Sequence, residues 1–194
     1  MSVIRRASQA ILVVFAMLLS TVNGTVLVPL YLEEMIDRSE VVFQGRCLAN
    51  RTVRDEKTNM VVTLTTFQVY DVLKGTVGQT HVIKQVGGSL PDEPLEYRFK
   101  GIPTFTVGKE YVVFLAGVSR SGFSSPIGLS QGSFEVTASR QVTNGRDFKD
   151  LTSRIAAKVP AMALKNIESA PGRVREMDLE DFKQTVRNQL RSGQ

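Results

Sequence analysis

Between residues 40 and 143 the chain contains a series of short β-type segments with no helical segment between successive ones. The longest, Met60–Leu73, is rich in β-branched residues, which favour a strand. One face of this strand would carry the alternate residues Val61, Thr63, Thr65, Phe67 and Val69. Turn-forming residues interrupt the series about every ten residues, a spacing typical of an antiparallel barrel or sandwich. The missing intervening helices exclude β-α-β units.

We predict a mainly β fold, an antiparallel β-barrel domain over residues 25–145. The charged stretch Arg51–Asn59 is expected as the loop between the first two strands. The remaining strands are expected at Glu40–Ala49, Thr80–Val86, Thr104–Val107, Glu110–Ala116, Ser133–Val136 and Gln141–Thr143.

Residues 1–24 have the pattern of a secretory signal peptide. Arg5 and Arg6 precede the uncharged apolar run Ala10–Leu19, which is too short to cross a bilayer. Short side chains then lead to a predicted cleavage after Gly24. We therefore expect export by the Sec route to the periplasm or the outside of the cell. The alternative is an uncleaved anchor, because Thr25–Leu32 is apolar again.

Helices are expected at both ends of the mature chain. Pro29–Ser39 predicts a short N-terminal helix, and residues 146–177 predict a polar linker. Residues 178–191 predict a C-terminal amphipathic helix with Asp178 as its N-cap. Its apolar stripe consists of Leu179, Phe182, Val186 and Leu190. This helix either packs on its own barrel or docks onto a partner.

Catalytic and metal-binding residues are scarce, since the chain has one Cys and one His. We predict no catalytic residue, no cofactor and no metal site. Cys47 lies on the small, apolar face of its strand, which indicates a core position; the alternative is a reactive thiol or a disulfide between chains. A Cys47–His81 dyad is the most direct catalytic alternative. Asp92, Glu93 and Glu96 lack a calcium-loop pattern and indicate a solvated acidic loop.

The charge balance gives little support to a nucleic-acid partner. After removal of residues 1–24, which contain two arginines and no acidic residue, 22 basic and 19 acidic side chains remain. The chain has no Trp, ten Phe and four Tyr, so aromatic side chains for stacking on bases are few. We predict no nucleic-acid partner and no transmembrane segment after signal cleavage.

A glycine-flanked segment is the candidate binding site. Its residues are Gly128, Leu129, Ser130, Gln131 and Gly132. Gln131 has an amide that suits a ligand, and the neighbouring loop Gly87–Lys100 completes the predicted surface. The alternative is a barrel corner in which Gln131 caps strand edges.

Three segments resemble the TIMP/netrin-type module: Ser39–Arg46 (SEVVFQGR), Phe67–Gly75 (FQVYDVLKG) and Val107–Leu115 (VGKEYVVFL). The chain also resembles a group of uncharacterised exported bacterial proteins with VLKG, GKEY and GLSQG-F segments. The resemblance covers residues 30–137 and implies an OB-like barrel. TIMPs present an N-terminal Cys to the zinc of a metalloprotease, whereas Thr25 would begin this mature chain and no Cys precedes Cys47. That inhibitory chemistry therefore does not carry over.

We predict an exported, non-catalytic binding or interaction module. Its partner is expected to be a protein of the cell envelope or the extracellular space. The alternatives are a regulator of an exported metalloprotease, by analogy with the TIMP-like fold, and a small hydrolase.

Overall fold

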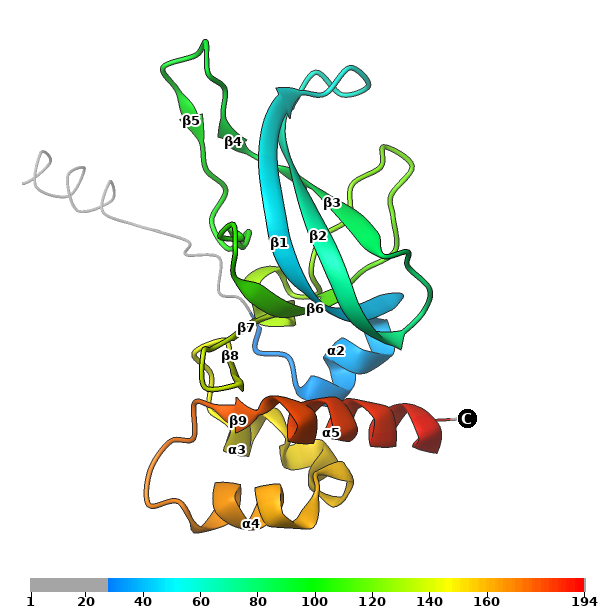
Figure 1. Ribbon diagram of the computed structural model, residues 1–194, viewed down its shortest axis with the longest axis vertical. Helices are drawn as coiled ribbons and strands as arrows, with labels where there is room; N and C mark the ends of the chain where they lie inside the picture. The colour runs from blue at the N-terminus through cyan, green and yellow to red at the C-terminus, as the bar shows by residue number, and fades with distance from the viewer. Residues whose placement is uncertain (1–27, 194) are drawn as a thin grey trace, which may run out of the picture.

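The computed structural model describes residues 28–193, so the predicted signal peptide lies outside the described residues. Seven antiparallel strands form one sheet in the order β3-β2-β1-β6-β7-β8-β9 (Figure 1). Their bounds are β1 Val41–Arg54, β2 Val61–Lys74, β3 Thr80–Val86, β6 Glu110–Leu115, β7 Ser133–Val136, β8 Gln141–Thr143 and β9 Met177–Asp178. The mainly β prediction is confirmed. Within residues 28–193 the edge strands β3 and β9 do not pair with each other, so barrel closure and the OB-like topology stay predictions.

The hairpin of β1 and β2 is the longest part of the sheet. Each strand has 14 residues, and they pair from Val42–Lys74 to Arg54–Val61. The β-branched sequence of β2 therefore extends the strand as predicted, and β1 continues five residues beyond its predicted end. On its other side β1 pairs with β6 only over Val41–Arg46. Beyond Arg46, β1 consequently has one strand neighbour instead of two, and we call this part, which lies toward the top of Figure 1, the upper half of β1.

A second, shorter hairpin stands beside the first (Figure 1). It consists of β4, Gly88–Ser89, and β5, Glu96–Tyr97, and we call residues 87–98 the arm. The strand predicted at Thr104–Val107 is absent. Phe105 instead turns inward and is buried, and the main-chain N–H of Thr106 donates to the hydroxyl of Tyr111 at 3.0 Å.

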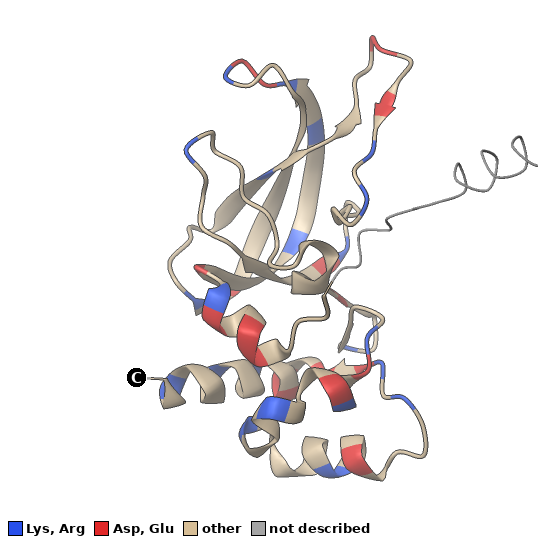
Figure 2. Ribbon diagram, turned by 180° about the vertical axis from the view of Figure 1, so that it is seen from behind, with Lys and Arg blue, Asp and Glu red and all other residues tan. Residues whose placement is uncertain are grey.

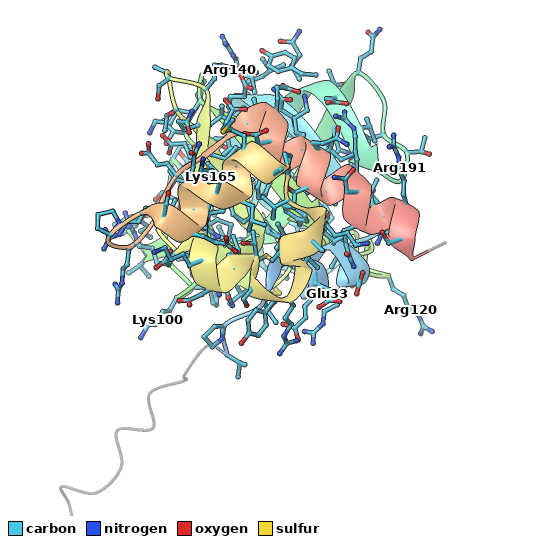
Figure 3. The ribbon with its side chains drawn as sticks, turned by 90° about the horizontal axis from the view of Figure 1, so that it is seen from below. Glu33, Lys100, Arg120, Arg140, Lys165 and Arg191 are labelled. Atoms are coloured by element: carbon cyan, nitrogen blue, oxygen red, sulfur yellow. The ribbon has the colours of Figure 1, made fainter. Side chains whose placement is uncertain are left out.

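Five helical segments gather at the end of the molecule opposite the arm (Figures 1 and 3). They are α2 Leu32–Arg38, α3 Phe148–Leu151, the 3₁₀ segment η2 Ser153–Lys158, α4 Ala161–Ser169 and α5 Leu179–Ser192. Residues 146–177 thus differ from the predicted linker. This segment is polar overall, but its few, widely spaced apolar residues are buried, among them Phe148, Leu151 and Ile167. Within residues 28–193 no helix combines the length and the apolar character needed to cross a bilayer.

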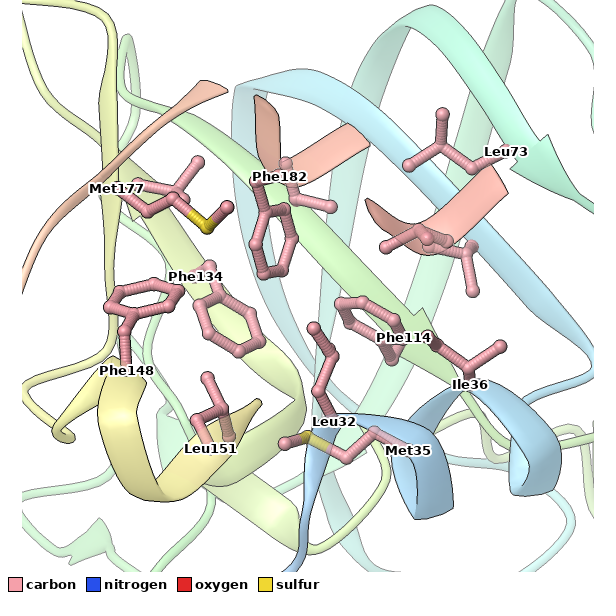
Figure 4. Close-up of a cluster of buried hydrophobic side chains, with 14 of the residues drawn as sticks. Leu32, Met35, Ile36, Leu73, Phe114, Phe134, Phe148, Leu151, Met177 and Phe182 are labelled. Carbon is pink, nitrogen blue, oxygen red and sulfur yellow. The ribbon is translucent and has the colours of Figure 1, made fainter. Parts of the chain in front are cut away.

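The lower core joins these helices to the sheet (Figure 4). Phe182 of α5 lies at its centre, with ring centroids 4.8 Å from Phe134 and 6.1 Å from both Phe114 and Phe148. The predicted N-cap of α5 is confirmed, since the Asp178 carboxylate accepts from the main-chain N–H groups of Glu180 and Asp181 at 2.9 and 3.2 Å. The apolar stripe of α5 therefore packs on its own chain.

A separate upper core lies under the hairpin. Its members are Phe43, Cys47, Phe67, Ile83, Phe105, Tyr111, Val113 and Leu115. The rings of Phe67, Phe105 and Tyr111 meet edge to face, with centroids 4.9 Å apart for Phe67–Phe105 and 5.1 Å for Phe105–Tyr111. This cluster fixes residue 105, and with it the chain that returns from the arm.

An ion-pair cluster ties α5 to the sheet at a second point. The Asp71 carboxylate of β2 lies 2.7 Å from both Lys183 and Arg187 of α5. Burial raises the pKa of Asp71, but the hydrogen bond and charge of Lys183 and the charge of Arg187 outweigh it, so the net pKa is lowered. The ionised carboxylate therefore stabilises the docked helix.

We expect Phe182→Ala to reduce the free energy of unfolding by about 3–5 kcal/mol, because it removes a large side chain from the centre of the lower core. Urea denaturation followed by circular dichroism measures the change. A loss below about 1 kcal/mol would show that α5 contributes little to the fold.

We expect Asp71→Asn to reduce the stability at pH 7 by about 2 kcal/mol, the scale of a hydrogen bond to a charged group. The folded-state pKa of Asp71 is lowered, so its contribution is complete above the unfolded-state pKa of about 3.9 and disappears as the pH falls through the folded-state value. The stability difference between the two proteins should therefore shrink as the pH falls below about 3.9. A difference that stays constant from pH 7 down into this acid range would contradict this role of the charge.

Candidate functional site

A groove of about 790 Å³ lies between the upper part of the β1–β2–β3 sheet and the chain that descends from the arm. Its floor is the sheet face that carries Asn50, Thr52, Thr63, Thr65 and Gln85. Its wall is formed by residues 96–105. The volume falls within the range of ligand-binding pockets in proteins, roughly 300–1,000 Å³.

The strand register explains why these floor residues lie together. Thr52 pairs with Thr63, and Thr63 pairs with Gln85 on β3. Asn50 pairs with Thr65 one row closer to the upper core. Because side chains alternate between the two faces of a strand, the same face that carries Phe67 below carries these polar side chains above. The upper core therefore continues directly into a polar floor.

Asn50 organises the lower end of the groove. Its Nδ2 donates to the main-chain oxygen of Phe105 at 2.6 Å, and its Oδ1 accepts from the Thr65 hydroxyl at 2.7 Å. These bonds join β1, β2 and the wall. One end of the groove is thus held by hydrogen bonds within the chain.

Two glycines allow the arm to leave the sheet at this point. Gly88 has φ +128°, and a Cβ there would lie 2.4 Å from the Thr63 hydroxyl oxygen and 2.6 Å from that of Thr52. Gly87 has φ +102°, and a Cβ there would lie 2.5 Å from the main-chain oxygen of Tyr97. Both conformations and both contacts require glycine. The double glycine, which the sequence marks as the end of a strand, therefore sets the contact between the arm and the floor.

Gln85 gives the floor an unused hydrogen-bonding group. Its side chain is 4% exposed and lines the groove, yet its Nε2 has no hydrogen-bond partner among the described residues. An unpaired buried amide costs free energy, about 1–3 kcal/mol in proteins. Such groups are uncommon, and a molecule that enters the groove, a water or a ligand, can complete the hydrogen bonding.

Charged residues divide along the arm (Figure 2). Glu93, near its tip, forms an ion pair with Arg54 at the end of β1 and accepts a hydrogen bond from the Tyr97 hydroxyl at 2.9 Å. Hydrogen bonds from Arg54 and Tyr97 lower the pKa of Glu93. Arg98 pairs with Glu96 at 2.8 Å, whereas Lys100 forms no ion pair within residues 28–193. The Lys100 side chain projects outward at the rim of the molecule (Figure 3).

The predicted binding segment, residues 128–132, lies below the groove and uses its polar groups internally. Gln131 Oε1 accepts from the N–H of Leu30 at 2.8 Å, and its Nε2 donates to the main-chain oxygen of Val28 at 3.1 Å. The N–H of Ser130 donates to the main-chain oxygen of Gly101 at 2.9 Å. Gly128 and Leu129 both have φ +62°, and Gly132 packs against Ile127. These contacts give the segment a structural role, the anchoring of the chain that leads into α2.

The structure separates the two residues of the alternative catalytic dyad. Cys47 is opposite Phe67, and Phe67 is opposite His81, so the dyad residues lie two strands apart, about 10 Å. Within residues 28–193 no hydrogen bond joins their side chains, and the Cys47 thiol instead contacts the Asn50 side-chain oxygen at 3.9 Å. Cys47 is fully buried, as the core interpretation predicted, and burial raises the pKa of its thiol. Burial also lowers the pKa of His81.

No grouping of three or more His, Cys, Asp or Glu side chains within residues 28–193 is arranged to hold a metal ion. Among the acidic loop residues, Glu93 and Glu96 are engaged with arginines. The described part of the chain therefore offers hydrogen bonding and charge at the groove instead of metal ligands.

The floor residues of the groove were not identified from the sequence. The available signal was in β2, where Thr63 and Thr65 occupy the same strand face as Val61 and Phe67. Polar residues on an otherwise apolar face indicate that the face leaves the core. The contribution of Gln85 depends on the β2–β3 register, which the sequence does not specify.

Comparison with protein-family models, with curated proteins and with solved structures found no match for this chain.

We expect Cys47 to resist alkylation in the folded protein, because the thiol is fully buried and its pKa is raised. Iodoacetamide labelling at pH 8, followed by mass spectrometry, should be slower than in urea by roughly 100-fold or more, since it requires local opening. Labelling of the single Cys in urea is the positive control. Rapid labelling of the folded chain would restore the thiol hydrolase as a candidate.

Proposed function

We propose that this chain is a non-catalytic binding module whose ligand occupies the groove between the β1–β2–β3 floor and residues 96–105. The observation that carries the proposal is the Gln85 amide nitrogen, which is buried in the groove floor and has no partner among the described residues. A ligand with a hydrogen-bond acceptor would remove the cost of that unpaired group. Removal of this free-energy cost would favour the ligand-bound state of the groove.

The rest of the groove supports binding in preference to catalysis. Its floor carries neutral hydroxyl and amide groups, and its wall carries aromatic and basic side chains together with Glu96, which is paired with Arg98. Neither Cys47 nor His81 lines it. Aromatic side chains with a few directed polar groups are typical of recognition sites.

The proposed setting follows from the predicted signal peptide, which lies outside the described residues. We propose that the chain acts after export, in the cell envelope or the extracellular space, on a protein of that compartment. The predicted surface of two loops contributes in part. The loop Gly87–Lys100 supplies most of the groove wall, and Ser130 holds its lower end through Gly101. The TIMP/netrin-like scaffold stays a prediction, and no contact in the groove favours protease inhibition.

We expect Phe99→Ala to weaken ligand retention, because the Phe99 ring lines the groove and lies against Gly87. Its side chain is 48% exposed, so the fold should tolerate the change. The matched control is Leu95→Ala, an exposed apolar residue of the adjoining arm that does not line the groove.

Immobilised residues 25–194 and both variants are incubated with an extract of the producing cells, and retained proteins and small molecules are identified by mass spectrometry. Species kept by the wild type and by Leu95→Ala but lost with Phe99→Ala are groove ligands. If all three proteins retain the same species, the groove is not the binding site.

A further inference from the structure

The upper half of β1 has a free edge beside the groove, and two of its residues, Asn50 and Thr52, line the groove floor. The register of β1 with β2 is continuous from Ala49–Thr66 to Arg54–Val61. Over this stretch β6 is no longer a neighbour, since its pairing with β1 ends at Arg46. In Figure 1 this side of β1 faces the arm and the chain that descends from it.

Two hydrogen bonds outside the β1–β2 pair show which main-chain groups of β1 point away from β2, toward its free edge. The main-chain oxygen of Val61 accepts from the N–H of Gly87, and the N–H of Val69 donates to the oxygen of Gln79. The main-chain N–H and C=O groups of odd-numbered β2 residues therefore point toward β3. The main-chain groups of even-numbered β2 residues point toward β1, where they bond to the main-chain groups of Arg51 and Val53.

The main-chain groups of the intervening β1 residues point away from β2. Asn50, Thr52 and Arg54 direct their N–H and C=O groups to the free edge, and no main-chain partner for them is found within residues 28–193. Three such residues cover about 13 Å of strand. The edge ends at the bond from Asn50 to Phe105 below and at the Arg54–Glu93 ion pair above. This is a slot for a short extended chain.

We infer that the ligand of the groove is an extended peptide segment of a partner protein, which adds to the sheet as a strand along residues 50–54 of β1. The inference rests on the proposed binding function and identifies its partner chemistry. Main-chain hydrogen bonds supply affinity in this type of recognition, and side chains on alternate faces supply specificity.

The charges around the edge indicate acidic side chains in the peptide. Arg51 and Lys100 form no ion pair within residues 28–193. Arg51 is on the outer face of β1, and Lys100 is on the groove wall. Alternate side chains of an added strand would reach these two cations on opposite faces, and opposite charges on neighbouring strands attract. Gln85 lies on β3, two strands from β1, so a peptide side chain would have to extend across the groove floor to accept from its amide.

The test starts from a phage-displayed library of random nonapeptides, selected on residues 25–194. We expect enriched peptides with Asp or Glu at alternating positions. Thr52→Pro removes one edge N–H without removing a bond to β2, and we expect it to weaken the synthesised peptide about tenfold. Thr52→Val keeps the N–H and removes only the floor hydroxyl, so we expect it to weaken binding less than Thr52→Pro does; an equal loss from both variants would assign the effect to the side chain and overturn strand addition. The matched proline control is Val82→Pro, whose N–H points out from the opposite edge of the sheet.

A scan of N-methyl groups along the peptide tests the same geometry without altering the protein. We expect methylation to abolish binding at every second residue, because only alternate N–H groups of an added strand face β1. Uniform tolerance of N-methylation, together with sensitivity to Phe99→Ala, would overturn strand addition but leave the groove as the binding site. Enrichment of no peptide would overturn the peptide class, while the Leu95 and Phe99 comparison would still decide the proposed function. Dimers of the purified chain that Thr52→Pro dissociates would assign the edge to a second copy and overturn the inference.

Discussion

The structure depends on an unequal pairing at β1. This strand pairs with β2 over its whole length but with β6 over less than half of it. The lower half is a central strand that separates the two cores. The upper half is an edge strand, and a bulge between Cys47 and Ala49 marks the transition. The groove exists because the chain after β5 crosses this upper half at a distance instead of pairing with it.

The two cores hold the unequal parts in place. The lower core fastens the sheet to α2 and to the C-terminal helices, with Phe182 at its centre and Asp71 reinforcing the contact. The upper core fixes Phe105, so that the wall of the groove is anchored at its base. Edge strands risk uncontrolled pairing with other chains, and charged residues reduce that risk. Arg51 and Arg54 fit such a protective role, and they bias the edge towards an acidic partner.

The sequence predicted the parts of the fold that depend on local pattern. The β-branched alternation of residues 60–73 indicated β2, and the apolar stripe after Asp178 indicated α5, with its cap. The helices of residues 148–169 were missed, since their few apolar residues are spread among polar ones and are buried only by contact with distant strands. Cys47 was predicted in the core from its neighbours. The groove was not, because Asn50, Thr63 and Gln85 come together only through the register of three strands. The flanking glycines led to the prediction that Gln131 binds a ligand, whereas its side-chain oxygen accepts a hydrogen bond from the main-chain N–H of Leu30.

Residue-resolved amide hydrogen exchange along β1 is the most direct measurement, because it reads the free edge in the unliganded protein. We expect slow exchange at Arg51 and Val53, whose N–H groups face β2, and fast exchange at Asn50, Thr52 and Arg54. Saturation with a library-selected peptide should then slow these three amides selectively. Equal protection of all five amides in the free protein, or no added protection with the peptide bound, would contradict the central claim that this edge of β1 is an open binding site.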